Sequence, residues 1–400
     1  MNAEQLIDAL NDLDDGVIEE TEKLRQAHKR RGGTWKRWTA AAACLCVVAA
    51  LAALPQLIPN GPAPTPTHPV HVDPGLLPLP LPELNGGFGF EEILLYDISE
   101  LGGVSPWNES MELTGLPVYE NNSYHPAGLP VGLDEYAILD RLEAAAQALD
   151  VEILDTEYEW EGDYNAELPA GTGSVVSITA HADGMEIAAY ADGSVQVSFE
   201  AGLPLPEGYR FTNAAADEEA EAALNYLVGR FSRLLDFSRP QAVLSGEYNF
   251  DGTFHRYDAV YDGGGGGVEA ILNYSFRRAE FLSDNGGNLT MIRLTDGLAC
   301  ARMLGDYPII TAAEARALLL NGSYITSVPY AMPGEDYVAG VELAYRGSRT
   351  DEYFLPYYRF YVELPEAAGD NGLKTYGVYY VPAVWKEYIA NMPVYDGIAS

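Results

Sequence analysis

Histidine and cysteine are scarce in this chain, and so are the short motifs that usually reveal an enzyme. Three cysteines occur in 400 residues, and two of them lie in one apolar stretch, so no disulfide framework is expected. The six histidines form no HExxH motif and no closely spaced Cys/His set, which argues against a zinc hydrolase. The motifs GxSxG, SxxK and GxxxxGK are also missing. The sequence therefore assigns no catalytic residue, no metal ligand and no cofactor.

Basic residues are concentrated at the N-terminal end. Lys and Arg occur seven times in residues 1–37, and the next base is Arg141. Between them lies Trp38–Ile58, which has no charged residue and is about long enough to cross a bilayer as a helix. This asymmetry predicts a single-pass protein of the cell membrane, with its N-terminus in the cytoplasm and its C-terminal part outside. A cleaved signal peptide, with Ala50–Ala52 as the cleavage site, and a buried alanine-rich helix are the alternatives to this signal anchor.

Acidic residues dominate the part after the apolar stretch. The whole chain carries 59 acids and 23 bases, for a formal net charge of −36, and residues 39–400 contain 51 of the acids and 16 of the bases. Such a surface repels phosphate backbones, so no nucleic-acid partner is expected. The charge either attracts cations or a basic partner, or only keeps the domain soluble.

The first residues have the pattern of an amphipathic helix. Within 3–31, Leu6, Leu10, Leu13 and Val17 recur at helical spacing. An apolar stripe without a core of its own needs a partner, so these four residues are the predicted contact with a cytoplasmic regulatory protein or the membrane surface. A solvated stalk is the alternative.

The rest of the chain alternates between helical and strand patterns. After a cytoplasmic helix at 1–37 and the span at 38–58, a Pro-rich linker covers 59–87, and three units then follow at 88–210, 211–305 and 306–400. Each unit opens with a helix, at about 133, 214 and 311, and continues with antiparallel strands; in the first unit a loop-like strap precedes the helix. We therefore expect an α+β fold of repeated helix-on-antiparallel-sheet units, and leave open whether the units are duplicates.

Short signals locate several turns and helix ends. Asp183-Gly184 and Asp192-Gly193 lie between alternating runs and predict two-residue hairpins. Asp134 and the pair Thr311/Glu314 predict helix starts. The five glycines at 263–267 are followed by Val268 and a strand-like segment to 276, so we expect a hairpin tip there.

Tyrosine is abundant, with 27 residues, and it gathers near the C-terminus. Tyr353, Tyr357, Tyr361, Tyr376 and Tyr379 are candidates for an outer aromatic surface that would bind a sugar or a protein. Filling of a sheet core is the alternative, because tyrosine suits half-buried strands.

The third unit carries a family resemblance. ITAAEARALLLNG at 310–322, followed by three strands, resembles the opening of a PepSY module, although Val381-Pro382-Ala383 replaces the usual aspartate-containing end. The strand GVYYVPAV at 377–384 is similar to the extracytoplasmic domains of the YycH and YycI regulators of Gram-positive bacteria. The chain as a whole resembles membrane-anchored proteins of gut Firmicutes. These resemblances imply one membrane span, a short cytoplasmic N-terminus and a regulatory role, and they carry no catalytic residues.

The leading hypothesis is a non-enzymatic, membrane-anchored sensor or regulatory binding protein. Its outer part would bind a protein, a peptide or a glycan, and its inner helix would contact a regulatory protein. The alternatives are an extracytoplasmic hydrolase that acts on cell wall or glycan through acidic residues, which requires two carboxylates in one cleft, and a purely structural surface protein.

Overall fold

The computed structural model describes residues 75–82, 93–96, 105–125, 128–165, 167–248, 252–367 and 373–394. All of them belong to the second of the two units into which the chain divides, 72–400. Helices and strands are both present, and the fold is α+β. No helix in these ranges is long and apolar enough to cross a membrane. The predicted span at 38–58 lies outside the described residues, as does the predicted inner helix with Leu6, Leu10, Leu13 and Val17.

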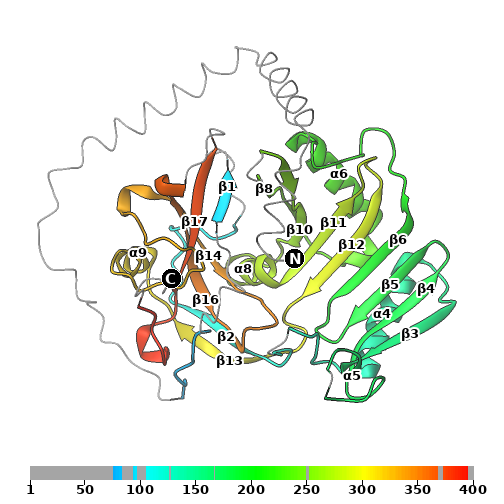
Figure 1. Cartoon of the computed structure of the whole chain (residues 1–400), viewed down its shortest axis with the longest axis horizontal. Helices are drawn as coiled ribbons and strands as arrows, with labels where there is room; N and C mark the ends of the chain where they lie inside the picture. The colour runs from blue at the N-terminus through cyan, green and yellow to red at the C-terminus, as the bar shows by residue number, and fades with distance from the viewer. Residues whose placement is uncertain are drawn as a thin grey trace, which may run out of the picture. The chain divides into compact units, whose positions relative to one another are not determined.

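An eight-stranded antiparallel sheet is the largest element of the described fold (Figure 1). Its strand order is β3-β4-β5-β6-β12-β11-β10-β7. The strands are β3 (Asp155–Trp160), β4 (Val175–Ala182), β5 (Met185–Tyr190), β6 (Val195–Leu203), β7 (Pro240–Val243), β10 (Ala259–Asp262), β11 (Arg277–Ser283) and β12 (Leu289–Asp296). The first four come from the predicted first unit and the last four from the second, and β6 pairs with β12 in the middle. The two predicted units therefore share one sheet.

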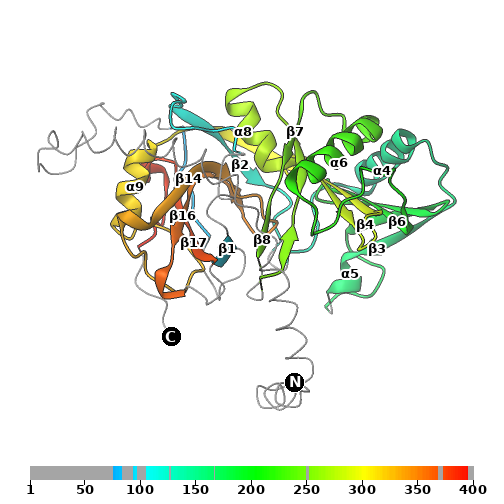
Figure 2. The same ribbon diagram turned by 90° about the horizontal axis from the view of Figure 1, so that it is seen from above.

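Three helices pack on one face of this sheet: α4 (Glu135–Leu149), α6 (Asp217–Arg230) and the short α7 (Ser232–Leu235). Figure 2 shows α4 and α6 over the same face. Ile138 and Leu142 of α4 lie one turn apart and are fully buried, as are Leu224 and Leu227 of α6. Burial of each such side chain stabilises the fold by about 1.5–3 kcal/mol, so these helices fix which face of the sheet is the core.

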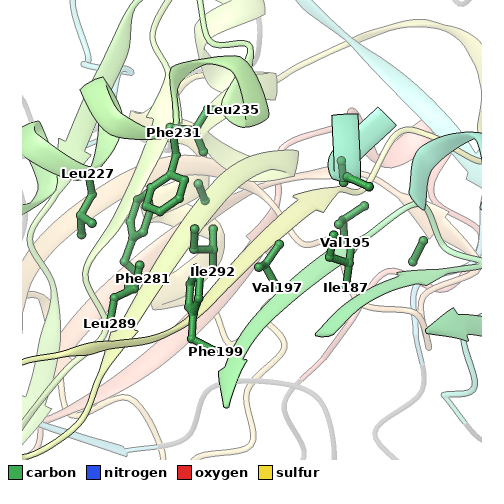
Figure 3. Packing of buried hydrophobic residues seen from close by; sticks show 14 of the residues in the cluster. Ile187, Val195, Val197, Phe199, Leu227, Phe231, Leu235, Phe281, Leu289 and Ile292 are labelled. Atoms are coloured by element: carbon green, nitrogen blue, oxygen red, sulfur yellow. The ribbon is translucent and has the colours of Figure 1, made fainter. Parts of the chain in front are cut away.

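The strands supply the other half of this core. Figure 3 shows Leu227, Phe231 and Leu235 on one side and Phe281 and Ile292 on the other. Because side chains alternate along a strand, the residues between the core positions lie on the opposite face of the sheet. That second face is polar over β4, β5, β6 and β12, where it carries Ser177, Thr179, His181, Glu186, Tyr190, Gln196, Ser198 and Arg293.

The predicted strand at 268–276 is wrong, because these residues form the helix α8 (Gly267–Phe276). Gly265, Gly266 and Gly267 all have positive φ angles, of 78°, 73° and 56°, which reverse the chain after β10 and start the helix. Tyr274 of α8 then packs edge-on against Tyr261 of β10, with ring centroids 5.4 Å apart. Tertiary packing thus makes residues 268–276 helical, although their local sequence pattern suits either a helix or a strand.

Residues from the C-terminal third form most of the remaining sheets. A four-stranded antiparallel sheet has the order β1-β17-β16-β14, and a three-stranded sheet has the order β13-β2-β15. Their strands are β1 (Ile93–Tyr96), β2 (Gly115–Asn121), β13 (Ala301–Pro308), β14 (Val338–Tyr345), β15 (Tyr353–Phe354), β16 (Pro356–Glu363) and β17 (Lys374–Pro382). A two-stranded ribbon joins β8 (Gly246–Tyr248) and β9 (Phe254–Arg256). The short helices are α5 (Glu161–Tyr164), η2 (Glu335–Tyr337), η3 (Pro365–Ala367) and η4 (Lys386–Tyr388).

Helix α9 (Ala312–Leu320) begins at the predicted capping box. The backbone N–H of Glu314 donates to Thr311 Oγ1 (3.2 Å), and the backbone N–H of Thr311 donates to Glu314 Oε2 (2.8 Å). Two amides that the helix cannot pair are thereby satisfied. The helix buries Ala315 and Leu319 in a cluster with Phe360 and Tyr379.

The end of the predicted Pro-rich linker is packed on the domain. Leu79 lies in a parallel bridge with Ile389, and its backbone N–H donates to the Tyr388 carbonyl oxygen (2.9 Å). The side-chain amide of Asn391 forms two hydrogen bonds with the backbone of Leu81. It donates to the Leu81 carbonyl oxygen (3.0 Å) and accepts from the Leu81 N–H (2.6 Å). Both leucines are 4% exposed and belong to a core cluster, so they anchor the segment 75–82 to the domain.

Candidate functional site

A polar cleft of about 500 Å³ lies beside the end of the central strand pair β6–β12. We call it the central cleft. One side is formed by the β5–β6 hairpin and by β12, and the other by the chain after β2 and the segment that joins β14 to β15. It is lined by Ser123, Tyr190, Asp192, Ser194, Val195, Gln196, Arg293, Thr295, Asp296, Gly297, Gly347, Arg349 and Phe354. The cleft therefore joins segments from all three predicted units.

Strand register places the polar side chains in the cleft. Gln196 of β6 is directly opposite Arg293 of β12, on the sheet face without α4, α6 and α7. Tyr190 lies on the same face of β5, because residues 187 and 189 point into the core. Burial raises the pKa of the Tyr190 hydroxyl, and the neighbouring Glu159 adds to this rise. Tyr190 is therefore a neutral hydrogen-bonding group at neutral pH.

An ion pair between Asp192 and Arg349 connects the two sides of the cleft. Asp192 belongs to the predicted Asp-Gly turn, and its Oδ1 also accepts from the backbone N–H (2.9 Å) and the hydroxyl (2.6 Å) of Ser194. Gly193 is required in this turn, because its φ is +90° and a Cβ there would lie 2.4 Å from the Cβ of Ala299. The hairpin thus holds the Asp192 carboxylate in a fixed position for Arg349.

The segment that carries Arg349 is held by buried polar groups. Arg346 forms an ion pair with Asp351, whose side chain is 4% exposed. Burial raises the pKa of Asp351 to about 6, although the guanidinium of Arg346 acts in the opposite direction. The side-chain amide of Asn121, at the end of β2, donates to the Asp351 carbonyl oxygen (2.7 Å). These contacts hold the backbone on both sides of Arg349 in place.

The second carboxylate of the cleft is also paired with an arginine. Asp296 Oδ2 accepts from Arg141 Nη2 at 3.0 Å. Both carboxylates of the cleft are thus engaged by guanidinium groups. No histidine, cysteine or lysine is among the described residues that line the cleft. The side chains that do line it offer hydrogen-bond donors and acceptors for polar groups.

The structure does not place the predicted tyrosines on an exposed surface. Tyr357, Tyr376 and Tyr379 are at most 2% exposed and belong to the core. Tyr353 and Tyr361 are half-buried, and the Tyr361 hydroxyl donates to Glu342 Oε1 (2.9 Å). Tyr357, Tyr376 and Tyr379 therefore fill the core of the sheet, which is the alternative that the sequence offered. The predicted outer aromatic surface is therefore wrong for these three.

Two other features singled out by sequence have structural roles. Cys300 is buried, its thiol donates to the Ala191 carbonyl oxygen (3.4 Å), and burial raises its pKa, which makes it a poor nucleophile. The glycine run does connect a strand to a helix, but the carboxylate of Asp262 accepts from the Gly264 N–H (3.0 Å), where a phosphate loop would offer amides to its ligand. The described residues contain no group of three or more side chains placed to hold a metal ion.

Sequence reasoning missed the cleft residues themselves. The sequence predicts Asp192 only as part of a turn and assigns no role to Arg293 or Arg349. The scarcity of bases after residue 38 is the one feature of the sequence that points to these arginines. Neither the models of known protein families nor the curated proteins include a match to this chain.

Proposed function

We propose that this chain is a single-pass, membrane-anchored regulatory binding protein whose outer part binds a polar ligand in the central cleft. The observation that carries this proposal is the ion pair between Asp192 and Arg349. It joins the eight-stranded sheet to the segment before β15, so a ligand that engages either side chain acts on both sides of the cleft. A signal received there would pass through the anchor at 38–58 to the predicted inner helix.

The cleft chemistry defines the class of ligand. Arg293 and Arg349 offer guanidinium donors, and Gln196, Tyr190 and Ser123 add neutral polar groups. Carboxylates and amides together satisfy this set, and peptides and wall peptidoglycan fragments carry both. We therefore propose a peptide-bearing wall fragment as the ligand.

Binding of a defined probe tests this proposal. Full-length protein in nanodiscs is titrated calorimetrically with disaccharide-peptide fragments of peptidoglycan. The Arg293→Gln variant is expected to bind at least tenfold more weakly, since a lost charged hydrogen bond costs about 1.5–3 kcal/mol. Arg302→Gln is the matched control. Arg302 pairs with Glu120 as Arg293 pairs with Glu280 (3.4 Å), but Arg302 lies on β13 outside the cleft. Equal binding by both variants, or no binding by the unaltered protein, contradicts the proposal.

The inner half of the proposal needs its own test. Full-length protein and a variant with Leu6, Leu10, Leu13 and Val17 changed to Ser are recovered from membranes by affinity capture. A cytoplasmic protein captured by the first and lost from the second supports a regulatory contact. Identical captured sets mean that the inner segment is only a stalk, and the outer binding role then stands alone.

A wall or glycan hydrolase is the second candidate, because the cleft holds two carboxylates, Asp192 and Asp296. Prolonged incubation with the same wall fragments, followed by mass spectrometry, distinguishes the two functions. Cleavage that Asp296→Asn abolishes would favour the hydrolase. Binding without turnover favours the regulatory protein.

A further inference from the structure

A second pocket lies on the helix-covered side of the eight-stranded sheet, between α4 and α7. We call it the helix-side pocket, and its volume is about 350 Å³. Ala144, Ala145 and Ala148 occupy one face of α4, and their small side chains leave the space that larger residues would fill. Leu234, Leu235 and Phe237 close the other side. The interior is thus mainly apolar and of a size typical for small-molecule sites.

Three guanidinium groups stand around this apolar interior, each from a different element. Arg141 of α4 donates to the Gly193 carbonyl oxygen (2.9 Å), and Arg233 of α7 donates to the Gln147 carbonyl oxygen (2.8 Å). Arg277 of β11 donates to the carbonyl oxygen of Asp236 (2.8 Å). Backbone carbonyls therefore orient all three arginines, and two of these also form ion pairs, Arg141 with Asp296 (3.0 Å) and Arg277 with Asp262 (3.5 Å). A guanidinium has five N–H donors, so each keeps further donors for a ligand.

Bases are concentrated around this pocket. Residues 39–400 have 51 acids and 16 bases, yet four of those bases line this one pocket, beside two aspartates, Asp236 and Asp296. The fourth arginine, Arg278, has its guanidinium over the ring of Tyr274, 5.6 Å from the centroid, on the α8 side of the sheet. Three arginines remain, and with Asp262, which pairs with Arg277 from outside the lining, three aspartates face them. The pocket thus gathers guanidinium groups in a strongly acidic protein without a net negative charge of its own.

We infer that the helix-side pocket binds a small organic carboxylate with an apolar body. This ligand differs from the peptide-bearing fragment proposed for the central cleft. Guanidinium forks recognise carboxylates by paired hydrogen bonds, and the alanines and leucines take up the hydrocarbon.

Pentanoate is a suitable probe because its short chain partitions little into lipid. Calorimetry with full-length protein in nanodiscs is expected to show pentanoate binding at least tenfold more tightly than pentanol or pentylamine. Arg233→Gln removes one guanidinium that makes a single backbone contact, and should weaken pentanoate binding at least fivefold. Ala148→Leu fills the apolar interior without a change of charge and should weaken it as strongly. Arg302→Gln lies on a different sheet and should leave binding unchanged.

Four results would overturn this inference. Pentanol that binds as well as pentanoate means that the arginines do not select an anion. If inorganic phosphate competes with pentanoate at equal concentration, the apolar interior takes no part in binding. The same conclusion follows if Ala148→Leu binds pentanoate with unaltered affinity. Loss of binding in Arg302→Gln means that only the overall charge matters. The Arg293→Gln test of the central cleft is independent, since Arg293 does not line the helix-side pocket.

Discussion

The carboxylate of Asp262 holds together the turn before β7 and the glycine run after β10. Its Oδ1 accepts from the backbone N–H of Arg239 (2.9 Å) and of Gly264 (3.0 Å), and its Oδ2 accepts from the backbone N–H of Ser238 (2.9 Å). The hydroxyl of Ser238 donates a fourth bond to Oδ1 (2.9 Å). Burial by itself would raise the pKa of Asp262, but these donors lower it to about 2 from an ordinary value of 3.8.

The lowered pKa defines both the sign and the size of the effect on stability. The folded state favours the ionised carboxylate, so the contribution is complete above the unfolded pKa of 3.8 and is lost as pH falls through about 2. The gap between the two values corresponds to about 2–3 kcal/mol at pH 7 and to about half of that at pH 3. In Asp262→Asn an amide NH₂ faces at least one backbone N–H. We therefore expect a loss of about 2–4 kcal/mol at pH 7 and a smaller loss at pH 3.

Urea unfolding of the full-length protein, followed by tryptophan fluorescence at pH 7 and pH 3, measures this loss. Both conditions avoid the isoelectric point near 4.3. Asp284→Asn is the control, because Asp284 also accepts from loop amides, those of Gly286 (2.8 Å) and Asn288 (2.9 Å), but in an exposed turn. A loss below about 0.5 kcal/mol at pH 7, within the range of ordinary surface changes, refutes the reasoning. An equal loss at both pH values refutes it as well.

Three further predictions concern local features. Thr311→Ala removes the α9 cap and should cost about 1 kcal/mol in urea unfolding, while Thr311→Ser should restore most of it; equal losses would exclude capping as the cause. Leu79→Ala should cost about 2–4 kcal/mol because Leu79 is 4% exposed, whereas Leu77→Ala, at a site 69% exposed, should change little; similar values would mean that the segment is not part of the core. Cys300, with both cysteines of the apolar span replaced by serine, should react with a thiol reagent at least about 100-fold more slowly in the folded protein than in urea, and rapid labelling would contradict its burial.

Elements with strong local signals were predicted well from the sequence. Asp134 caps α4 as expected, since its Oδ1 accepts from the Ala137 N–H (2.9 Å). The turn at Asp183-Gly184 joins β4 to β5 as the predicted two-residue hairpin, whereas Asp192-Gly193 lies in the longer loop 191–194 between β5 and β6. In each case a few neighbouring residues determine the backbone conformation, so one stretch of sequence carries the whole signal.

Features that depend on distant contacts were missed. The segment 268–276 contains residues that suit either a helix or a strand, and packing of Tyr274 on Tyr261 comes only with the completed fold. In the third unit, β15 and β16 are separated by Leu355 alone, yet β15 pairs with β2 while β16 pairs with β14 and β17, in different sheets. The central cleft is the extreme case, since Asp192 and Arg349 meet across 157 residues of chain.

The docking of residues 75–82 against Tyr388 and Ala390 has a mechanical consequence. The described residues begin and nearly end at this one place. Tension on the chain before residue 75 would load the backbone hydrogen bonds of Leu79 with Tyr388 and Ala390, and neither partner belongs to the eight-stranded sheet. A pull on this end would therefore act on that junction before it acts on the strands that line the two pockets.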